Sequence, residues 1–148
     1  MDHTPDSIFV RKAEERDYPA MVRIQMACPE AAQWPLGDYS RFETLVAFLA
    51  SEPVGFCAWR QSAPDEAELL NLAVDPAHHR KGVASALLRA LLETARGDIF
   101  LEVAEPNLPA IFLYKKHGWS QIGMRPGYYH AGKINGIVMK KRSWYSPG

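Results

Sequence analysis

A basic turn before an amphipathic segment carries the most specific chemistry in the sequence. The segment HHRKGVA, residues 78–84, lies between a β-like run at Leu69–Val74 and a long helix-like pattern. A glycine in the first turn of a helix lets a phosphate approach the backbone, where amide groups lack intrahelical partners and the helix dipole is positive. Arg80 and Lys81 add mobile positive charge. The turn therefore favours a phosphate-bearing ligand, with a solvated helix cap as the alternative.

The type of phosphate site is narrowed by what the turn lacks. It has neither the GK[ST] ending of a nucleoside-triphosphate loop nor the three glycines of the dinucleotide fingerprint. It also has no carboxylate suited to magnesium, which favours a metal-free pyrophosphate. The five histidines, Cys28 and Cys57 show no metal-ligand spacing and no nucleophile-base set, so we expect no metal and no hydrolase site.

The elements around the turn predict a strand, a crossover helix and a second strand. Gly97 is expected to end the helix. The residues that share its apolar face are Val83, Leu87, Leu88, Leu91, Leu92 and Ala95. A strand at Ile99–Val103 follows, and such a succession normally forms a right-handed parallel pair.

The flanking segments add further strands and helices. We expect a strand at Ile8–Val10, a helix starting at Asp17 as capping residue, and a hairpin turning near Ser51. A second helix should run from Asn107 to His117. Two last strands, 119–124 and 133–140, should be joined by the loop RPGYYHAG, residues 125–132. The pattern predicts an α/β protein with a mixed sheet.

These segments resemble the GNAT superfamily of acetyltransferases. The turn is similar to its Q/R-x-x-G-x-G/A signature, with His79 first, Gly82 fourth and Ala84 sixth. AELLNLAVDPAHHRKGVASALL, FLEVAEPNLPAIFLYKKHGW and RPGYY resemble stretches of bacterial ribosomal-protein-alanine N-acetyltransferases, the RimI-like group, over roughly residues 66–129. The resemblance implies one GNAT domain over residues 1–148. Its sheet should be mixed and mostly antiparallel, with a central parallel pair and helices on both faces.

The resemblance also implies acetyl-CoA as co-substrate, lying in an opening between the two parallel strands. Its pantetheine would bind to the end of the first strand and its pyrophosphate to the following turn, with a last contact beyond the second strand. The implied residues are Leu72, Ala73, Val74, His79, Arg80, Lys81, Gly82, Val83, Ala84, Ser85, Asn107 and Tyr114. His79 stands where the family usually has Gln or Arg.

Acetyl transfer to an amine needs a base, a polarised carbonyl and an acid for the thiol. By resemblance, Glu102 is the base and Tyr114 the acid, and we expect the Val74 amide to stabilise the oxyanion. From the residues alone, a solvent-facing strand residue is the preferred interpretation of Glu102. Tyr114 would then be a helix aromatic packed on Trp119 or Phe112.

The acceptor is expected to be a protein N-terminus, and a ribosomal protein is one candidate. Tyr128 and Tyr129 would form a wall for its backbone, and Trp34 either the opposite wall or part of the core. An α-amine, with a pKa near 8 against about 10.4 for lysine, is the easier amine to neutralise. Residues 133–136 carry basic and neutral side chains where the ribosomal enzymes present acids, which leaves a small amine as the alternative acceptor.

Length and composition favour a single folded domain. At 148 residues, 47% hydrophobic and with 17 basic and 17 acidic residues, the chain suits one globular domain without a field that would attract DNA. No apolar run suits a membrane span or an export signal, so we expect a cytoplasmic monomer or homodimer. The expected function is acetyl transfer in a ternary complex. A non-catalytic acyl-CoA sensor is the alternative from another class, followed by a nucleic-acid-binding module.

Overall fold

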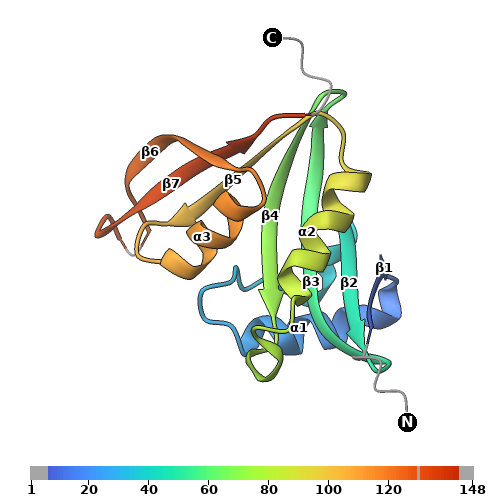
Figure 1. Ribbon diagram of the computed structural model, residues 1–148. Helices are drawn as coiled ribbons and strands as arrows, with labels where there is room; N and C mark the ends of the chain where they lie inside the picture. The colour runs from blue at the N-terminus through green and yellow to red at the C-terminus, as the bar shows by residue number, and fades with distance from the viewer. Residues whose placement is uncertain (1–6, 130, 144–148) are drawn as a thin grey trace. The chain divides into compact units, whose positions relative to one another are not determined.

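The structure is a computed structural model that describes residues 7–129 and 131–143 (Figure 1). Its strands are β1 (Ile8–Lys12), β2 (Glu43–Leu49), β3 (Glu52–Ala63), β4 (Glu66–Val74), β5 (Asp98–Ala104), β6 (Ser120–Tyr129) and β7 (Ile134–Lys141). Its α-helices are α1 (Tyr18–Met26), α2 (Val83–Thr94) and α3 (Leu108–Lys116), and its 3-10 helices are η1 (Glu15–Asp17), η2 (Leu36–Arg41) and η3 (Pro76–His78).

The described strands form a seven-stranded sheet in the order β1-β2-β3-β4-β5-β7-β6. β4 and β5 are parallel, with Glu66–Glu68 in register with Asp98–Phe100, and β1-β2, β2-β3, β5-β7 and β6-β7 are antiparallel. The crossover from β4 to β5 contains α2, as the sequence predicts. The mixed α/β fold with one parallel pair is therefore confirmed.

The chain forms two compact units. The first unit comprises Met1–Trp59 and Asn71–Thr94, and the second comprises Arg60–Leu70 and Ala95–Gly148, so that β3 and β4 contribute to both. A single domain over residues 1–148 stays a prediction. Within the part of the chain that the structure describes, no helix has the length and apolar character needed to cross a membrane.

Within the first unit, α1 and α2 lie against opposite faces of β3. A Cβ on Gly55 would lie 2.9 Å from Val83 Cγ1 and 3.3 Å from Leu87 Cδ1, so the bare backbone lets α2 approach the strand closely. The neighbouring Phe56 points the other way, into a core cluster with Met21 and Ile24 of α1. The alternation of strand side chains thus places helices on both faces.

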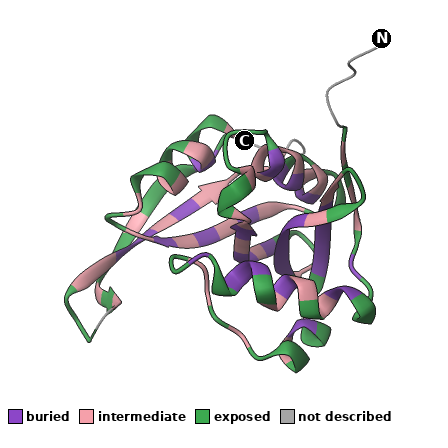
Figure 2. Cartoon of the chain, turned by 90° about the horizontal axis from the view of Figure 1, so that it is seen from below, coloured by how far each residue is buried: buried purple, intermediate pink, exposed green. Residues whose placement is uncertain are grey.

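The predicted apolar face of α2 is the buried one. Val83, Leu87, Leu88 and Leu91 are buried, whereas Arg89 and Glu93 are exposed. Figure 2 shows the same separation of buried and exposed residues along the helices and strands. The amphipathic pattern therefore determines how α2 packs on the strands of its unit.

One expected loop is largely a strand. The segment RPGYY belongs to β6, which continues to Tyr129 and pairs there with Ile134. From sequence, Pro126 and Gly127 are typical of a turn, because proline lacks an amide donor and glycine tolerates a positive φ. In the structure Gly127 does have a φ of +62°. Even so, a register shift between Arg125 and Tyr129 absorbs both residues, because β7 offers a partner on either side of it. Tyr128 and Tyr129 are therefore strand residues.

The start of α1 is as expected, but the role of Asp17 is different. Pro19 lies in the first turn, yet the Asp17 carboxylate makes no capping hydrogen bond to α1. It accepts hydrogen bonds from both guanidinium nitrogens of Arg11, at 2.7 and 3.0 Å, and from the Glu14 amide at 2.7 Å. Asp17 thus joins η1 to β1 over six residues of chain, a contact that the residue pattern of a helix start does not reveal.

This arrangement predicts a loss of acid stability in Asp17→Asn. Hydrogen bonds from Arg11 hold the pKa of Asp17 below its ordinary value. Its contribution is therefore complete above the unfolded-state pKa, near 4, and disappears as the pH falls through the folded-state pKa. We expect Asp17→Asn to lower the free energy of unfolding by about 2 kcal/mol at pH 7, and by less at pH 3.

Urea denaturation at the two pH values measures the effect. Arg16→Gln is the control, because it removes an exposed ion pair to Glu14 and should change stability by less than about 0.5 kcal/mol. An equal loss at pH 7 and pH 3 in Asp17→Asn would contradict the electrostatic account.

Candidate active site

The turn after β4 has a shape set by its own residues. The Asp75 amide donates to the Val54 carbonyl at 2.8 Å, and the Asp75 carboxylate accepts from the Ala77 amide at 3.0 Å. η3 follows, and the chain then passes through two left-handed residues, Arg80 with φ +65° and Gly82 with φ +84°, before α2 begins. The turn thus delivers the chain directly into the first turn of α2.

The first turn of α2 fits an anionic group. The Ala86 amide donates to the Gly82 carbonyl at 3.0 Å, so the amides of Val83 and Ala84 precede that first intrahelical bond. A Cβ at Gly82 would meet only Ile8 Cδ1 within 4 Å, at 3.9 Å, which leaves open space at this point of the backbone. Arg80, Lys81 and Gly82 are exposed. Amide donors, open space and two mobile cations together suit a phosphate.

The side chain of His79 lies against the end of β4. Its Nε2 donates to the Val74 carbonyl over 2.9 Å, and the Cys28 thiol donates to the same oxygen over 3.1 Å. Leu72, Ala73 and Val74 form the last residues of that strand, with Ala73 buried. Residues 72–85, which were predicted from sequence to bind CoA, therefore all lie in the first unit. The contact of His79 with a phosphate stays a prediction.

In the second unit, Glu102 faces a cavity of about 260 Å³. Leu101 and Val103 on either side of it are buried, so Glu102 and Phe100 point to the opposite face of β5. Residues of β4, β6 and β7 contribute to the lining: Glu66, Glu68, Arg125 and Val138. The expected base is therefore in a concave site rather than on an open strand surface.

The Glu102 carboxylate is paired with Arg125, a residue that sequence reasoning missed. Nε of Arg125 lies 2.7 Å from Oε1 of Glu102, and the two side chains are 61% and 20% exposed. Across β7, Arg125 is in register with Gly136 and Glu102 with Val138, which makes them diagonal neighbours. Only this register could have predicted the contact between Arg125 and Glu102. The register depends on the bulge in β6, which is not visible in the sequence.

Tyr128 and Tyr129 lie beside this ion pair. Their rings meet edge to face at 4.9 Å, and the Arg125 guanidinium stands 5.2 Å from the centre of the Tyr128 ring. Burial, and then the charge of Glu102, raise the pKa of the Tyr129 phenol. Tyr128 is 52% exposed. The two tyrosines thus extend the Glu102 site with one accessible and one half-buried ring.

Asn107 and Tyr114 hold α3 in place. The Asn107 side chain accepts from the Ala110 amide over 3.4 Å and so caps the helix. Tyr114 is 8% exposed, and its ring packs against Trp119 at 5.9 Å. The expected packing of Tyr114 on Trp119 is therefore confirmed, and its role as an acid stays a prediction.

Trp34 packs against the core of the first unit. Its ring lies 5.4 Å from Tyr39 and 5.0 Å from Phe42, and its carbonyl accepts a hydrogen bond from Gln25 over 2.6 Å. These contacts favour the core alternative over a wall for the acceptor.

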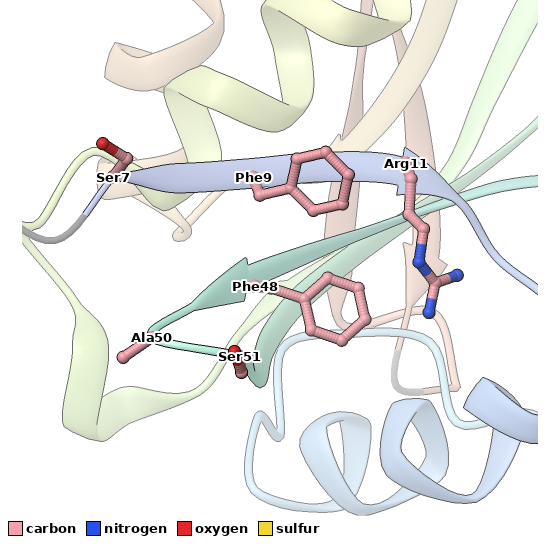
Figure 3. A pocket seen from close by; sticks show the side chains of 6 residues that line it. All are labelled: Ser7, Phe9, Arg11, Phe48, Ala50 and Ser51. Carbon is pink, nitrogen blue, oxygen red and sulfur yellow. The ribbon is translucent and has the colours of Figure 1, made fainter.

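A second cavity, of about 400 Å³, lies in the first unit between β1 and the turn after β2 (Figure 3). Phe9 and Phe48 line it from adjacent strands, and Arg11 lies over the Phe48 ring at 4.7 Å. None of the residues that the sequence marked for chemistry lines it. Among the described residues no three His, Cys, Asp or Glu side chains are grouped to hold a metal, and His3 and His130 lie outside them.

Curated relatives and solved structures match this chain. It is 34% identical over 101 residues to the N-alpha-acetyltransferase RimI of Mycobacterium tuberculosis, covering 68% of this chain and 61% of that protein. It is 40% identical over 81 residues to the [ribosomal protein bS18]-alanine N-acetyltransferase of Escherichia coli, covering 51% and 55%. The chain thus spans less than two thirds of the length of either relative.

The fold is shared more completely. The crystal structure of the ribosomal-protein-S18-alanine N-acetyltransferase from Escherichia coli matches with a TM-score of 0.82 and 25% identity, over 95% of this chain and 97% of that one. Ard1 from Thermoplasma volcanium matches with a TM-score of 0.82 and 29% identity, over 91% and 97%. The acetyltransferase (GNAT) family matches residues 8–119. The chain therefore belongs to the acetyltransferase (GNAT) family.

Proposed function

We propose that this protein transfers an acetyl group from acetyl-CoA to a primary amine, most simply the N-terminal α-amine of a protein or peptide. The observation that carries the proposal is the open first turn of α2, where amides and two cations follow the end of β4. Family membership supports the same ligand, since that turn is the part of the sequence that resembles the GNAT signature.

In this proposal the first unit binds the carrier. The backbone of Leu72, Ala73 and Val74 would bind the pantetheine arm, and the turn formed by residues 79–85 would bind the pyrophosphate. Helix-terminal amides bind phosphate oxygens without a metal ion, because the donors and the dipole both favour negative charge. Asn107, at the start of α3 in the second unit, stays a predicted contact by resemblance.

The second unit supplies the acid-base groups. Glu102 would take a proton from the acceptor's ammonium group, which leaves a neutral amine with a free electron pair. That pair would form the new C–N bond at the thioester carbonyl, and the C–S bond would break as the tetrahedral adduct collapses. Tyr114 would give its proton to the departing sulfur, and the second proton on the attacking nitrogen would pass through solvent to restore the phenol. The Val74 amide would stabilise the oxyanion. The attack is direct, so no acyl-enzyme forms.

A protein N-terminus is the preferred acceptor for two reasons. The relatives named above act on an α-amine, one of them on an alanine of ribosomal protein bS18. The exposed ring of Tyr128 beside the Glu102 cavity suits contact with a peptide backbone. Action at the ribosome would place the protein in the cytoplasm.

Glu102→Gln should separate turnover from carrier binding. The amide cannot accept the proton, so we expect kcat to fall by about 10²- to 10⁴-fold while the Kd of CoA changes less than about twofold. Glu105→Gln is the matched control, because Glu105 lies on the same segment and its Oε1 accepts a hydrogen bond from Asn135 at 3.2 Å. An undiminished kcat in Glu102→Gln would remove this residue from the mechanism.

Gly82→Glu should block the carrier. A carboxylate at the first turn of α2 repels a phosphate and fills the open space, so the Kd of CoA should rise more than about tenfold. Gly82→Ala is the control, since it shares the strain of a φ near +84° without the charge. Titration calorimetry with CoA measures both variants, and equal weakening in the two would argue for strain alone.

Parallel acceptor panels test the substrate class. With acetyl-CoA, we expect transfer to peptides that begin with alanine or serine, and little transfer to spermidine, free amino acids or aminoglycosides. Mass spectrometry of the products locates the acetyl group. Acetylation confined to the small amines would reverse the preference, and CoA binding without any transfer would support the sensor instead.

A further inference from the structure

The ion pair between Glu102 and Arg125 places a cation where the acceptor's own cation has to arrive. The Arg125 nitrogen is 2.7 Å from the Glu102 carboxylate, which is the distance an ammonium group would take. We propose that Arg125 is a specificity-determining residue: it holds the amine position beside Glu102 in the free protein, and an acceptor must displace it. This inference rests on the proposed function, because it concerns the same carboxylate.

The exposure of the two partners supports displacement. Glu102 is 20% exposed and Arg125 61% exposed, so the arginine is the outer member of the pair. A ligand coming from solvent therefore meets Arg125 before it meets the carboxylate. Arg125 also lies at the start of the register shift in β6, where the regular ladder is interrupted. A cation in such a place can swing outward without disturbing a packed interior.

A structural ion pair elsewhere in the chain shows the contrast. Arg11 and Asp17 are bonded through two nitrogens and both carboxylate oxygens, and their side chains are only 26% and 10% exposed. Arg125 makes its ion-pair contact to Glu102 through Nε, and its guanidinium also lies over the ring of Tyr128, itself 52% exposed. The first geometry is that of a fixed brace, and the second is that of a replaceable partner.

Exchange of one cation for another explains a selectivity for charged amines. An acceptor that brings a positive charge restores the charge balance of Glu102 when Arg125 leaves, whereas a neutral ligand would leave a half-buried carboxylate unpaired. After transfer the acceptor nitrogen is an amide without charge. Once Glu102 has released the proton that it took, Arg125 can return to the carboxylate, which favours departure of the product.

Binding measurements test this without relying on turnover. The probes are a hexapeptide that begins with alanine and its Nα-acetylated form, each titrated into protein saturated with CoA. Arg125→Met keeps the apolar stem, while the charge and the guanidinium over the Tyr128 ring are lost. We expect the free-amine peptide to bind about three- to tenfold more tightly than to the wild type, and the acetylated peptide to bind equally to both.

Two further variants locate the effect. Arg60→Met is the matched control, because Arg60 pairs at 2.5 Å with Glu68, which lines the same cavity, and its side chain is 54% exposed. It should leave the affinity for the free-amine peptide within about twofold. In Glu102→Gln with Arg125→Met the gain should vanish, since it depends on the charge of Glu102.

The outcomes separate this inference from the proposed function. Weaker or unchanged binding of the free-amine peptide in Arg125→Met, or no binding in either protein, would overturn the displacement by Arg125 even if the wild type transfers acetyl groups. The expected binding pattern in a protein that transfers none would support Arg125 as the displaced cation and overturn the proposed transferase activity instead. A gain of equal size for the acetylated peptide would show that loss of bulk, rather than charge exchange, is responsible.

Discussion

A half-buried carboxylate needs a partner of opposite charge, and Glu102 shows what this requires of the second unit. Its neighbours along β5 are buried, so its side chain must leave the strand on the cavity side. The cation comes from β6, two strands away, where Arg125 is in register with Gly136 of the intervening β7. A side chain at Gly136 would touch Tyr129 at 3.4 Å and Tyr128 at 3.5 Å. The ion pair and the two tyrosines therefore share one small space.

The first unit solves a different problem, which is to present backbone donors to a charged ligand. α2 can do so because its apolar face is fixed on β3 over Gly55, while the turn before it stays exposed. Burial of Val83 directly after the exposed Gly82 marks the boundary between the anchored helix and its accessible end. The hydrophobic pattern thus decides which part of the helix remains available for chemistry.

Much of this follows from sequence because the signals are local. The period of the apolar residues predicts α2, the segment after Asp75 predicts the turn, and the hairpin of β2 and β3 follows from two β-like runs around Ser51. Arg125 could not be predicted in the same way, because its contact depends on how β6 and β7 pair after a bulge. Asp17 was interpreted as a helix cap because the pattern of a helix start does not show which way its carboxylate points, and that carboxylate turns to Arg11 of β1.

The Val74 carbonyl has a consequence for any molecule that lies along the end of β4. An oxygen of this kind has two lone pairs, and the thiol of Cys28 and the imidazole of His79 already donate to it. A visiting amide that needs an acceptor must therefore use an earlier residue of the strand or first turn the imidazole aside. Cys28 is buried whereas His79 is exposed, so the imidazole is the donor that can move aside.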